Sequence, residues 1–304
     1  MKAVVLRETG GPEALRVDDV AEPSVGDGEV RLRVRAAGVN FLDVLVRQGR
    51  YPQMPELPTI LGVEVAGDVD GRRAIALPQA GGYAEEVSVA ADSVVPLPAG
   101  ASYEEGASFL MAFLTAYIPL TRQVRLERGQ TVLVHAGAGG VGGAAIQLAK
   151  HFGSRVVATA GSEEKRAFAR EHGADEVFAY DEFGEHVRAD VVLDPVGGAL
   201  VAESHKVLRP LGAHVLLGFA GGWWEPVDPA LLVGRNVSLV GFYLGRLMRH
   251  APDVVQAATA ELITLWAQGA VRPVVGSTFA LADAGEAHRL IEERKHVGKV
   301  VLLP

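Results

Sequence analysis

Residues 131–150 read TVLVHAGAGGVGGAAIQLAK, and this stretch decides the fold. An apolar run is followed by the glycine pattern G-x-G-x-x-G and then by residues with helical periodicity. The three glycines are Gly137, Gly139 and Gly142. In a strand-to-helix turn, such glycines allow a tight bend, close approach of the backbone to a pyrophosphate, and close packing of helix on strand.

A helix that begins after these glycines directs its free N–H groups and the positive end of its dipole at the phosphates of a ligand. The backbone donors that we expect are those of Gly140 and Val141. The stretch therefore predicts a dinucleotide site. The alternative is a strand-to-helix turn that holds no ligand.

Downstream of this stretch, apolar segments alternate with segments of helical periodicity. The apolar segments are RVVATAG (155–161), EVFAYD (176–181), ADVVLD (189–194), AHVLLGF (213–219) and SLVGFYL (238–244). Apolar strands separated by helices are typical of a parallel sheet that is covered on both faces. With the strand at residue 131, they predict a doubly wound α/β domain over residues 113–244, with six strands in the order 3-2-1-4-5-6.

Residues 1–112 follow a different pattern, in which short β segments are separated by Gly and Pro. These segments are KAVVL (2–6), EVRLRVRAAGV (29–39), VEVAGDV (63–69), RRAIALP (72–78) and YAEEVSVA (83–90). They predict a small, mostly antiparallel β domain. After residue 245, two helical stretches and a final apolar strand close the chain, and we expect them to complete this first domain.

The end of the second α/β strand indicates which coenzyme the site prefers. NAD-binding versions of the motif carry a carboxylate about 20 residues beyond the glycines, whereas this strand ends at Ala160 and Gly161. Ser162 can donate a hydrogen bond to a 2′-phosphate and Lys165 can supply charge, which predicts NADPH. Two alternatives stay open. Ser162 can simply cap the next helix while Lys165 is solvated, and Glu163 can turn inward to the ribose, which would favour NAD.

Composition and charge exclude several classes of function. The net charge of −8 offers no basic field for nucleic acid. Cysteine is absent, which excludes disulfides, thiolate catalysis and zinc sites with a Cys ligand. No H-E-x-x-H pair, G-x-S-x-G elbow or P-loop is present. No apolar run reaches the roughly 18 residues of a membrane span, and the N-terminus does not resemble a signal peptide. We expect a soluble, cytoplasmic protein without a bound metal.

Several segments, in the same order along the chain, carry a resemblance to a known family. They are AAGVNFLDVLVRQGRYP (36–52), LGVEVAG (61–67), GGYAEE (81–86), AGAGGVG (136–142) and GKVVLLP (298–304). Here the chain resembles the zeta-crystallin-like quinone oxidoreductases of the medium-chain dehydrogenase/reductase family. The resemblance implies a GroES-like catalytic domain formed by residues 1–112 and 245–304. It also implies a Rossmann domain at residues 113–244, with the active cleft between the two domains.

Zinc alcohol dehydrogenases of the same family differ from this chain at their metal ligands. Where they place a Cys and the His of a Gly-His-Glu segment, this chain has Asn40 and Val63. Without Zn²⁺ there is no Lewis acid to lower the pKa of an alcohol. The resemblance therefore implies the zinc-free reduction of an easily reduced acceptor rather than alcohol oxidation.

The resemblance also implies which side chains form the site. Around the nicotinamide and the acceptor it places Asn40, Asp43, Tyr51 and Thr115. It places Tyr180 beside the adenine and Arg294 at the 2′-phosphate. On the nicotinamide side it places Val196, Gly218, Phe219, Phe242 and Leu244. Taken without the family, Asn40 and Thr115 also fit structural roles, and the apolar positions also fit the core or strand ends.

Residues and resemblance together predict the NADPH-dependent reduction of a quinone or a related conjugated carbonyl compound, by hydride or electron transfer. One alternative is an enoyl or alkenal double-bond reductase of the same fold, and another is a nucleotide-binding protein without turnover. The apolar strand at residues 236–244 would be the last in the sheet order and carries no charge. It therefore predicts a homodimer in which two such strands pair antiparallel.

Overall fold

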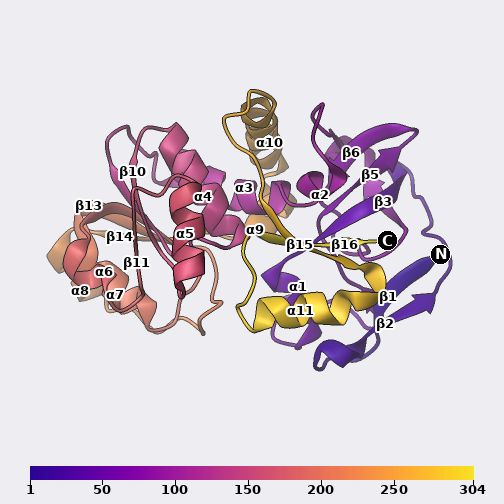
Figure 1. Ribbon diagram of the computed structural model, residues 1–304, viewed down its shortest axis with the longest axis horizontal. Coiled ribbons are helices and arrows are strands. Elements are labelled where there is room, and N and C mark those ends of the chain that lie inside the picture. Colours follow the sequence, from indigo (N-terminus) through magenta and orange to yellow (C-terminus); the bar gives the residue numbers. More distant parts are fainter. The chain divides into compact units, whose positions relative to one another are not determined.

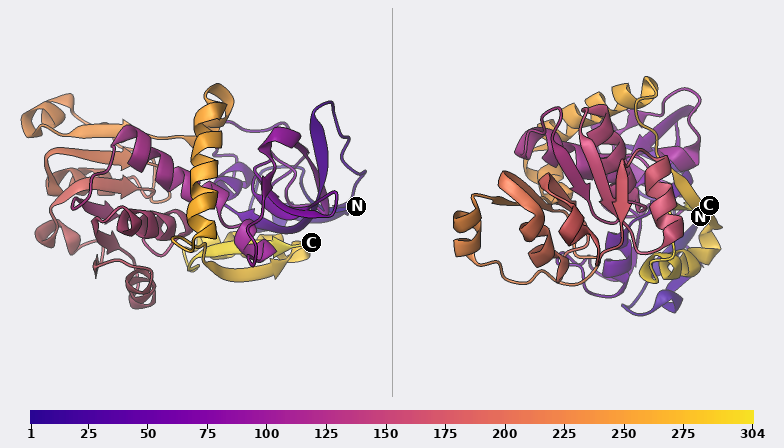
Figure 2. Two further views of the ribbon diagram at one scale, coloured as in Figure 1. Left: turned by 90° about the horizontal axis from the view of Figure 1, so that it is seen from above. Right: turned by 60° about the vertical axis from the view of Figure 1, so that its left-hand side comes forward.

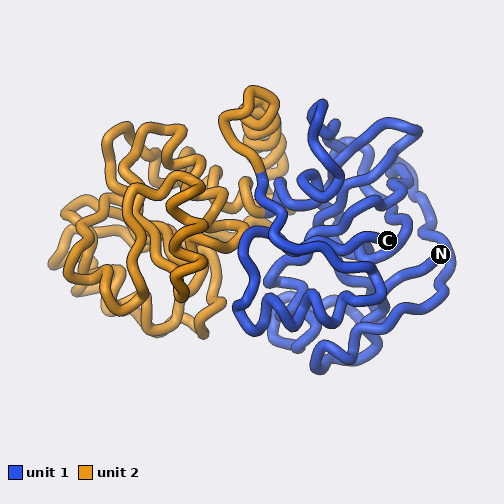
Figure 3. Tube along the Cα trace, viewed as in Figure 1, with its two compact units in different colours: residues 1–111, 273–304 blue, residues 112–272 orange.

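The computed structural model describes residues 1–304, and the chain forms two compact units. Unit 1 contains Met1–Met111 and Pro273–Pro304, and unit 2 contains Ala112–Arg272 (Figure 3). The second unit is thus inserted into the sequence of the first.

Unit 1 is built on a seven-stranded sheet with the order β15-β16-β3-β5-β6-β8, in which β7 also pairs with β3. The strands are β3 (Glu29–Val39), β5 (Val65–Val69), β6 (Arg72–Ala76), β7 (Glu86–Ala90), β8 (Val95–Pro96), β15 (Val275–Ala280) and β16 (Lys299–Leu303). All pairs are antiparallel except β15 with β16. Figure 1 shows the C-terminal strands, in yellow, beside the purple β3. Strands from before and after unit 2 in the sequence therefore share one sheet.

A smaller sheet of three strands places β1 (Lys2–Leu6) between β2 (Leu15–Asp19) and β4 (Thr59–Ile60). The helices of unit 1 are α1 (Phe41–Arg47), α2 (Tyr103–Gly106) and α11 (Ala284–Glu292), with 3₁₀ turns η1 (Pro12–Ala14), η2 (Ala91–Ser93) and η4 (Leu281–Asp283). The apolar faces of α1 and α11 pack with β1, β3 and β16 into one core. This core holds the junction between β3 and α1, where Asn40 is the N-cap of the helix.

Unit 2 contains a six-stranded sheet with the order β11-β10-β9-β12-β13-β14. The strands are β9 (Thr131–Val134), β10 (Arg155–Thr159), β11 (Glu176–Phe178), β12 (Ala189–Asp194), β13 (Leu208–Leu216) and β14 (Ser238–Gly241). Every pair is parallel. In order of appearance along the chain this is 3-2-1-4-5-6, so the Rossmann prediction is confirmed.

Helices lie on both faces of this sheet (Figure 2). The helices of unit 2 are most of α3 (Leu110–Ile118), α4 (Gly140–His151), α5 (Glu163–Glu171), α6 (Phe183–His186), α7 (Leu200–Val207), α8 (Pro229–Arg235), α9 (Leu244–His250) and α10 (Pro252–Ala267), with a π-helical turn η3 (Pro119–Gln123). The strands β9 and β10 are almost completely buried, as the continuous apolar segments predicted. No helix of the chain combines the length and apolarity that crossing a bilayer requires.

Residues 245–272 lie in unit 2, whereas the sequence analysis placed them in the first domain. Helix α10 is fixed there by polar contacts. Glu261 of α10 accepts a hydrogen bond from the Tyr117 hydroxyl (2.6 Å) and pairs with Arg122 (2.8 Å). The Gln147 amide of α4 donates to the Arg272 carbonyl (2.9 Å). The sequence predicted a helix after residue 245, but its pattern does not identify the core that the helix packs against.

Candidate coenzyme and acceptor site

The glycine-rich turn lies between β9 and α4, at the carboxyl edge of the sheet in unit 2. The N–H of Gly137 donates to Thr159 O (3.0 Å), and the N–H of Gly139 donates to Ala136 O (2.9 Å), which holds the turn against β10. Helix α4 then starts at Gly140 behind the N-cap Gly139, and no side chain caps it. A helix start without a side-chain cap leaves its first N–H groups for a ligand or for water. The geometry of the turn is compatible with a pyrophosphate, and the pyrophosphate site stays a prediction.

The close packing around the turn shows what each glycine does. A Cβ at Gly142 would lie 2.1 Å from the carbonyl oxygen of Ala136, so this position admits only glycine. A Cβ at Gly137 would lie 2.9 Å from the Cβ of Ala158 on β10. We expected Gly137 to make the tight bend, but the left-handed residue is Ala136, with φ 52°. Gly137 instead allows the turn to pack closely on β10.

His135 lies below this turn and is fully buried. Its Nδ1 is 2.8 Å from Thr159 Oγ1 and its Nε2 is 2.8 Å from Ser204 Oγ. Burial lowers the pKa of His135 to about 4, so the ring is neutral near pH 7. Both ring nitrogens are engaged, and the residue supports the turn rather than transferring protons.

The start of α5 carries the residues expected to choose the coenzyme. Ser162 is the N-cap, and its Oγ accepts a hydrogen bond from the N–H of Lys165 (3.3 Å). The carboxylate of Glu163 pairs with Arg166 (2.9 Å) and Arg170 (2.8 Å) along the surface of the same helix. Hydrogen bonds from Arg170 and Arg166 lower the pKa of Glu163. The acid that could have favoured NAD is therefore engaged with two arginines of its own helix.

The loop after β12 is fixed by the buried side chain of Asp194. Its Oδ1 accepts hydrogen bonds from the N–H groups of Val196 (2.7 Å) and Gly197 (2.9 Å). Its Oδ2 is 3.1 Å from His214 Nε2 on β13. Burial by itself would raise the pKa of Asp194, but these hydrogen bonds and the nearby imidazoles of His214 and His135 hold it below its usual value. Asp194 is therefore ionised and holds Val196 in place.

The loop after β13 packs on the loop after β12. The N–H of Gly221 donates to Val196 O (2.7 Å), and Gly197 and Gly222 form a parallel bridge. Gly218 and Phe219, which the resemblance places on the nicotinamide side, begin this loop and are half-buried. Val196, Gly218 and Phe219 thus lie in two connected loops at the carboxyl edge of the sheet.

The remaining predicted residues of unit 2 lie in more varied surroundings. Phe242 and Leu244 follow β14 and are buried, at 8% and 4% exposure. The Tyr180 ring follows β11, and its centroid is 6.3 Å from that of His135. Thr115 is half-buried on α3 (Leu110–Ile118).

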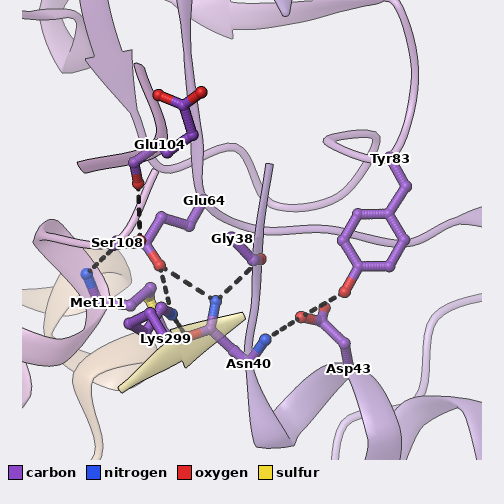
Figure 4. A network of polar contacts seen from close by, with 9 residues as sticks. All are labelled: Gly38, Asn40, Asp43, Glu64, Tyr83, Glu104, Ser108, Met111 and Lys299. Atoms are coloured by element: carbon purple, nitrogen blue, oxygen red, sulfur yellow. Dashed lines mark hydrogen bonds and ion pairs between the residues drawn. The ribbon is translucent and has the colours of Figure 1, made fainter. Parts of the chain in front are cut away.

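In unit 1, Asn40 is held by a buried ion pair (Figure 4). Lys299 Nζ donates to Asn40 Oδ1 (2.6 Å) and to Glu64 Oε2 (2.8 Å). The Asn40 amide group donates to Glu64 Oε2 and to Gly38 O, both at 3.3 Å. Since Lys299 only donates and Glu64 accepts, the orientation of the Asn40 amide is fixed. The other oxygen of Glu64 accepts the N–H of Met111 (2.9 Å) at the start of α3.

Asp43 lies behind Asn40 and is only 1% exposed. Its Oδ2 accepts hydrogen bonds from the Asn40 N–H (2.8 Å) and from the Tyr83 hydroxyl (3.1 Å), as Figure 4 shows. Tyr83 is in turn 3.2 Å from His288 Nε2 of α11. Burial raises the pKa of Asp43 to about 6, although the bonds from Asn40 and Tyr83 oppose this rise. Asp43 is therefore buried and stabilises the first turn of α1, and its carboxylate is not exposed to a ligand.

Two further predicted residues of unit 1 lie in different surroundings. Tyr51 is half-buried and packs on the core of unit 1. Arg294 follows α11, is exposed, and has a left-handed backbone with φ 55°. Within unit 1 the structure thus joins Asn40 and Asp43 in one network, whereas Tyr51 lies against the core and Arg294 lies at the surface.

Five residues of these networks were not predicted from the sequence: Glu64, Lys299 and Tyr83 in unit 1, and Asp194 and His214 in unit 2. The signal was a single polar residue within an apolar segment, as in LGVEVAG and GKVVLLP. A lone charge at such a position is almost always buried with a partner. No group of three or more His, Asp or Glu side chains is placed to hold a metal ion.

Comparison with known proteins gives consistent matches. The family model described as "Alcohol dehydrogenase GroES-like domain" matches residues 26–75, and "Zinc-binding dehydrogenase" matches residues 172–302. The quinone oxidoreductase of Pseudomonas aeruginosa is 34% identical over 324 residues, covering 100% of this chain and 99% of the relative. The human synaptic vesicle membrane protein VAT-1 homolog is 31% identical over 341 residues, covering 100% and 86%.

Solved structures extend the comparison to the whole fold. The quinone oxidoreductase of Thermus thermophilus, which was also solved in complex with NADPH, matches with a TM-score of 0.92 and 41% identity. The Escherichia coli quinone oxidoreductase complexed with NADPH matches with a TM-score of 0.91 and 29% identity. Both matches cover 100% of this chain and 100% of the other.

Proposed function

This chain belongs to the zinc-free quinone oxidoreductase branch of the medium-chain dehydrogenase/reductase family, and we propose that it catalyses the NADPH-dependent reduction of quinones or related conjugated carbonyl compounds. The observation that carries the proposal is the glycine turn at α4, where the helix start has no side-chain cap and a Cβ at Gly142 would collide with Ala136 O. Such a turn, beside the point where the strand order reverses, is where doubly wound sheets bind dinucleotides.

For the coenzyme, the N–H groups of Gly140 and Val141 would hold the pyrophosphate, with the cradle formed by Gly137, Gly139 and Gly142. Ser162, Lys165 and Arg294 would contact the 2′-phosphate, and Tyr180 would lie against the adenine. The nicotinamide would be bordered by Val196, Gly218, Phe219, Phe242 and Leu244. The ion pairs of Glu163 with Arg166 and Arg170 support NADPH over NADH. They hold the Glu163 carboxylate at the helix surface, where it would not bind the ribose of NADH.

When bound, NADPH supplies a hydride equivalent and leaves as NADP⁺, and with one proton from solvent a quinone becomes a hydroquinone. The chain's own residues bind and orient the acceptor. Tyr51 and Thr115 would donate hydrogen bonds to the oxygen being reduced, and this is electrostatic stabilisation without a metal. Asn40 would border the acceptor, since its amide group already donates to Glu64 and Gly38. Asp43 would act through Asn40, because its carboxylate is buried behind that residue.

The choice between acceptors is tested by steady-state turnover with NADPH. We expect higher kcat/KM values for 1,2- and 1,4-quinones than for enones or enoyl thioesters. The reverse order would favour the alternative, an enoyl or alkenal double-bond reductase of the same fold. NADPH oxidation with any of these acceptors excludes a nucleotide-binding protein without turnover.

We also propose that the protein is a cytoplasmic homodimer joined through β14, which occupies Ser238–Gly241 of the strand expected at residues 236–244. β14 has a neighbour on one side only, in β13. Its residues Ser238–Gly241 carry no charge that would oppose pairing with a second copy. At its end, Gln123 donates to the Gly241 carbonyl (3.2 Å), so pairing would use the earlier part of the strand.

A further inference from the structure

We propose that Trp223 is an acceptor-binding residue, whose exposed indole stacks on planar, uncharged, polycyclic quinones. This inference rests on the proposed function and names the class of acceptor. Trp223 is 60% exposed, which is unusual for so large an apolar side chain. It belongs to the aromatic loop, which we define as residues 218–224 (GFAGGWW).

The aromatic loop lies where a doubly wound sheet binds its ligands. It follows β13, and its backbone is bonded to the loop after β12: Gly221 N–H donates to Val196 O (2.7 Å) and Ala220 N–H donates to Pro195 O (3.2 Å). β12 pairs with β9, whose own carboxyl end carries the glycine turn. The strand order reverses between β9 and β12, and ligands occupy this edge of such sheets. Trp223 is therefore one strand away from that point.

The aromatic side chains of the loop form a cluster with a fixed orientation. The ring centroids of Phe219 and Trp223 are 4.9 Å apart, and those of Trp223 and Trp224 are 5.4 Å apart. Trp224 is anchored because its Nε1–H donates to the Gly218 carbonyl (3.0 Å). Phe219 and Trp224 thus both pack near the Trp223 indole, and the exposed part of this residue is available to a flat ligand. A pre-positioned aromatic surface binds a ring with little loss of entropy.

The charges beside the cluster select the kind of ligand. Glu225 follows Trp224 directly, and Asp228 lies three residues further on as the N-cap of α8; both are exposed. They would repel an anionic ligand, such as a thioester of a phosphate-bearing carrier, and have no effect on an uncharged quinone. The same argument makes Trp223 a poor contact for the phosphates of NADPH. The ligand that fits is neutral, planar and aromatic.

The test compares wild type with Trp223→Ala, Trp223→Phe and the control Val233→Ala, which truncates another exposed apolar side chain, on α8 at 78% exposure. At saturating NADPH, we expect Trp223→Ala to raise the KM for 9,10-phenanthrenequinone about five- to tenfold, while kcat and the KM for 1,4-benzoquinone stay within about twofold. Trp223→Phe should restore most of the affinity, and Val233→Ala should behave as wild type. Equal changes for the two quinones, or no change, would overturn the proposal.

A binding measurement separates this proposal from the proposed function. Calorimetric titration of 9-phenanthrol, which is planar but accepts no hydride, should show binding to wild type and about a fivefold or larger loss in Trp223→Ala. Such a loss supports the role of Trp223 even if quinones prove to be poor acceptors. Unchanged binding of 9-phenanthrol refutes that role even if quinones are reduced. Dissociation of an oligomer by Trp223→Ala would also refute it, since Trp223 would then belong to a subunit interface.

Discussion

Lys299 Nζ lies 2.8 Å from Glu64 Oε2, and the two side chains are almost completely buried, at 7% and 1% exposure. Both also contact the amide of Asn40. A buried pair contributes little net stability when intact, but removing one partner leaves a buried charge uncompensated. The relationship therefore gives a stability prediction that does not depend on the reaction.

Lys299→Met should lower the free energy of unfolding by about 3–5 kcal/mol, measured by urea denaturation. The double variant Lys299→Met with Glu64→Leu should recover most of this loss, because no charge is left without a partner. The exposed pair of Lys2 and Asp19 is the control, and Asp19→Asn should leave the unfolding free energy nearly unchanged. A loss for Lys299→Met as small as that of the control would contradict the uncompensated burial of Glu64.

Acid sensitivity should depend on His288. Burial lowers the pKa of His288 from 6.5 to about 3, so the folded state binds fewer protons than the unfolded state between these values. The contribution of neutral His288 to the unfolding free energy is complete above pH 6.5, and it is lost as the pH falls from 6.5 toward 3. As the pH falls through this window, the unfolding free energy of His288→Gln should therefore decrease less steeply than that of wild type, by up to about 1.4 kcal/mol per pH unit.

Asp43 has the opposite effect on the pH dependence of the unfolding free energy in part of this pH range. Its pKa is raised from 3.8 to about 6, so its contribution is present at low pH and is lost as the pH rises through this range. Unfolding free energies should be compared at several pH values between about 4 and 6.5, with the exposed His250→Gln as control. Parallel curves for His288→Gln and wild type would contradict the assignment.

Coenzyme choice should depend on Lys165. If it contacts the 2′-phosphate, Lys165→Ala removes a charge-assisted hydrogen bond of about 1.5–3 kcal/mol, discounted for exposure to water. NADPH binding should then weaken by about tenfold, with NADH nearly unchanged. Lys206→Ala, at an exposed lysine of α7, is the matched control. The test is titration of wild type and variant with both coenzymes. Equal losses of affinity for NADPH and NADH would assign Lys165 a structural role. Tighter binding of NADH than of NADPH by wild type would show that Glu163 binds the ribose.

The assembly prediction concerns the free edge of β14. Phe242 N–H donates to Leu216 O on β13, and because backbone groups alternate along a strand, the N–H of Leu239 faces the free edge. Leu239→Pro should remove that donor and shift a dimer toward monomers in sedimentation velocity. A wild-type protein that is monomeric at every concentration would contradict the edge-strand dimer.

The fold could be predicted from local patterns because its signals are strong. Continuous apolar strands and the glycine turn indicated the parallel sheet and its strand order, and β3 was predicted with its observed bounds, Glu29–Val39. Helix α10 was also predicted, but not its unit, because a helical pattern does not identify the surface that the helix covers. α8 and α9 were missed because each has only seven residues, too few for a periodic pattern to be clear.

The site was predicted less completely, for a physical reason. Glycine positions follow from backbone geometry and can be recognised in a short motif. The partners of Asn40 come from residues far apart in the sequence, since Glu64 and Lys299 are separated by 235 positions. No local pattern joins them. The buried position of Asp43 depends on Tyr83 and on the core behind it, which a motif does not reveal.

The measurement that tests the central claim most directly is the stoichiometry of the reaction in the absence of oxygen. Wild type is mixed with a known amount of NADPH and an excess of 9,10-phenanthrenequinone, and both NADP⁺ and hydroquinone are quantified. The proposed function predicts one hydroquinone for each NADPH consumed, and loss of this reaction in Gly142→Val, whose side chain would collide with Ala136 O in the coenzyme turn. NADPH that remains unoxidised, or is oxidised without formation of hydroquinone, would contradict it.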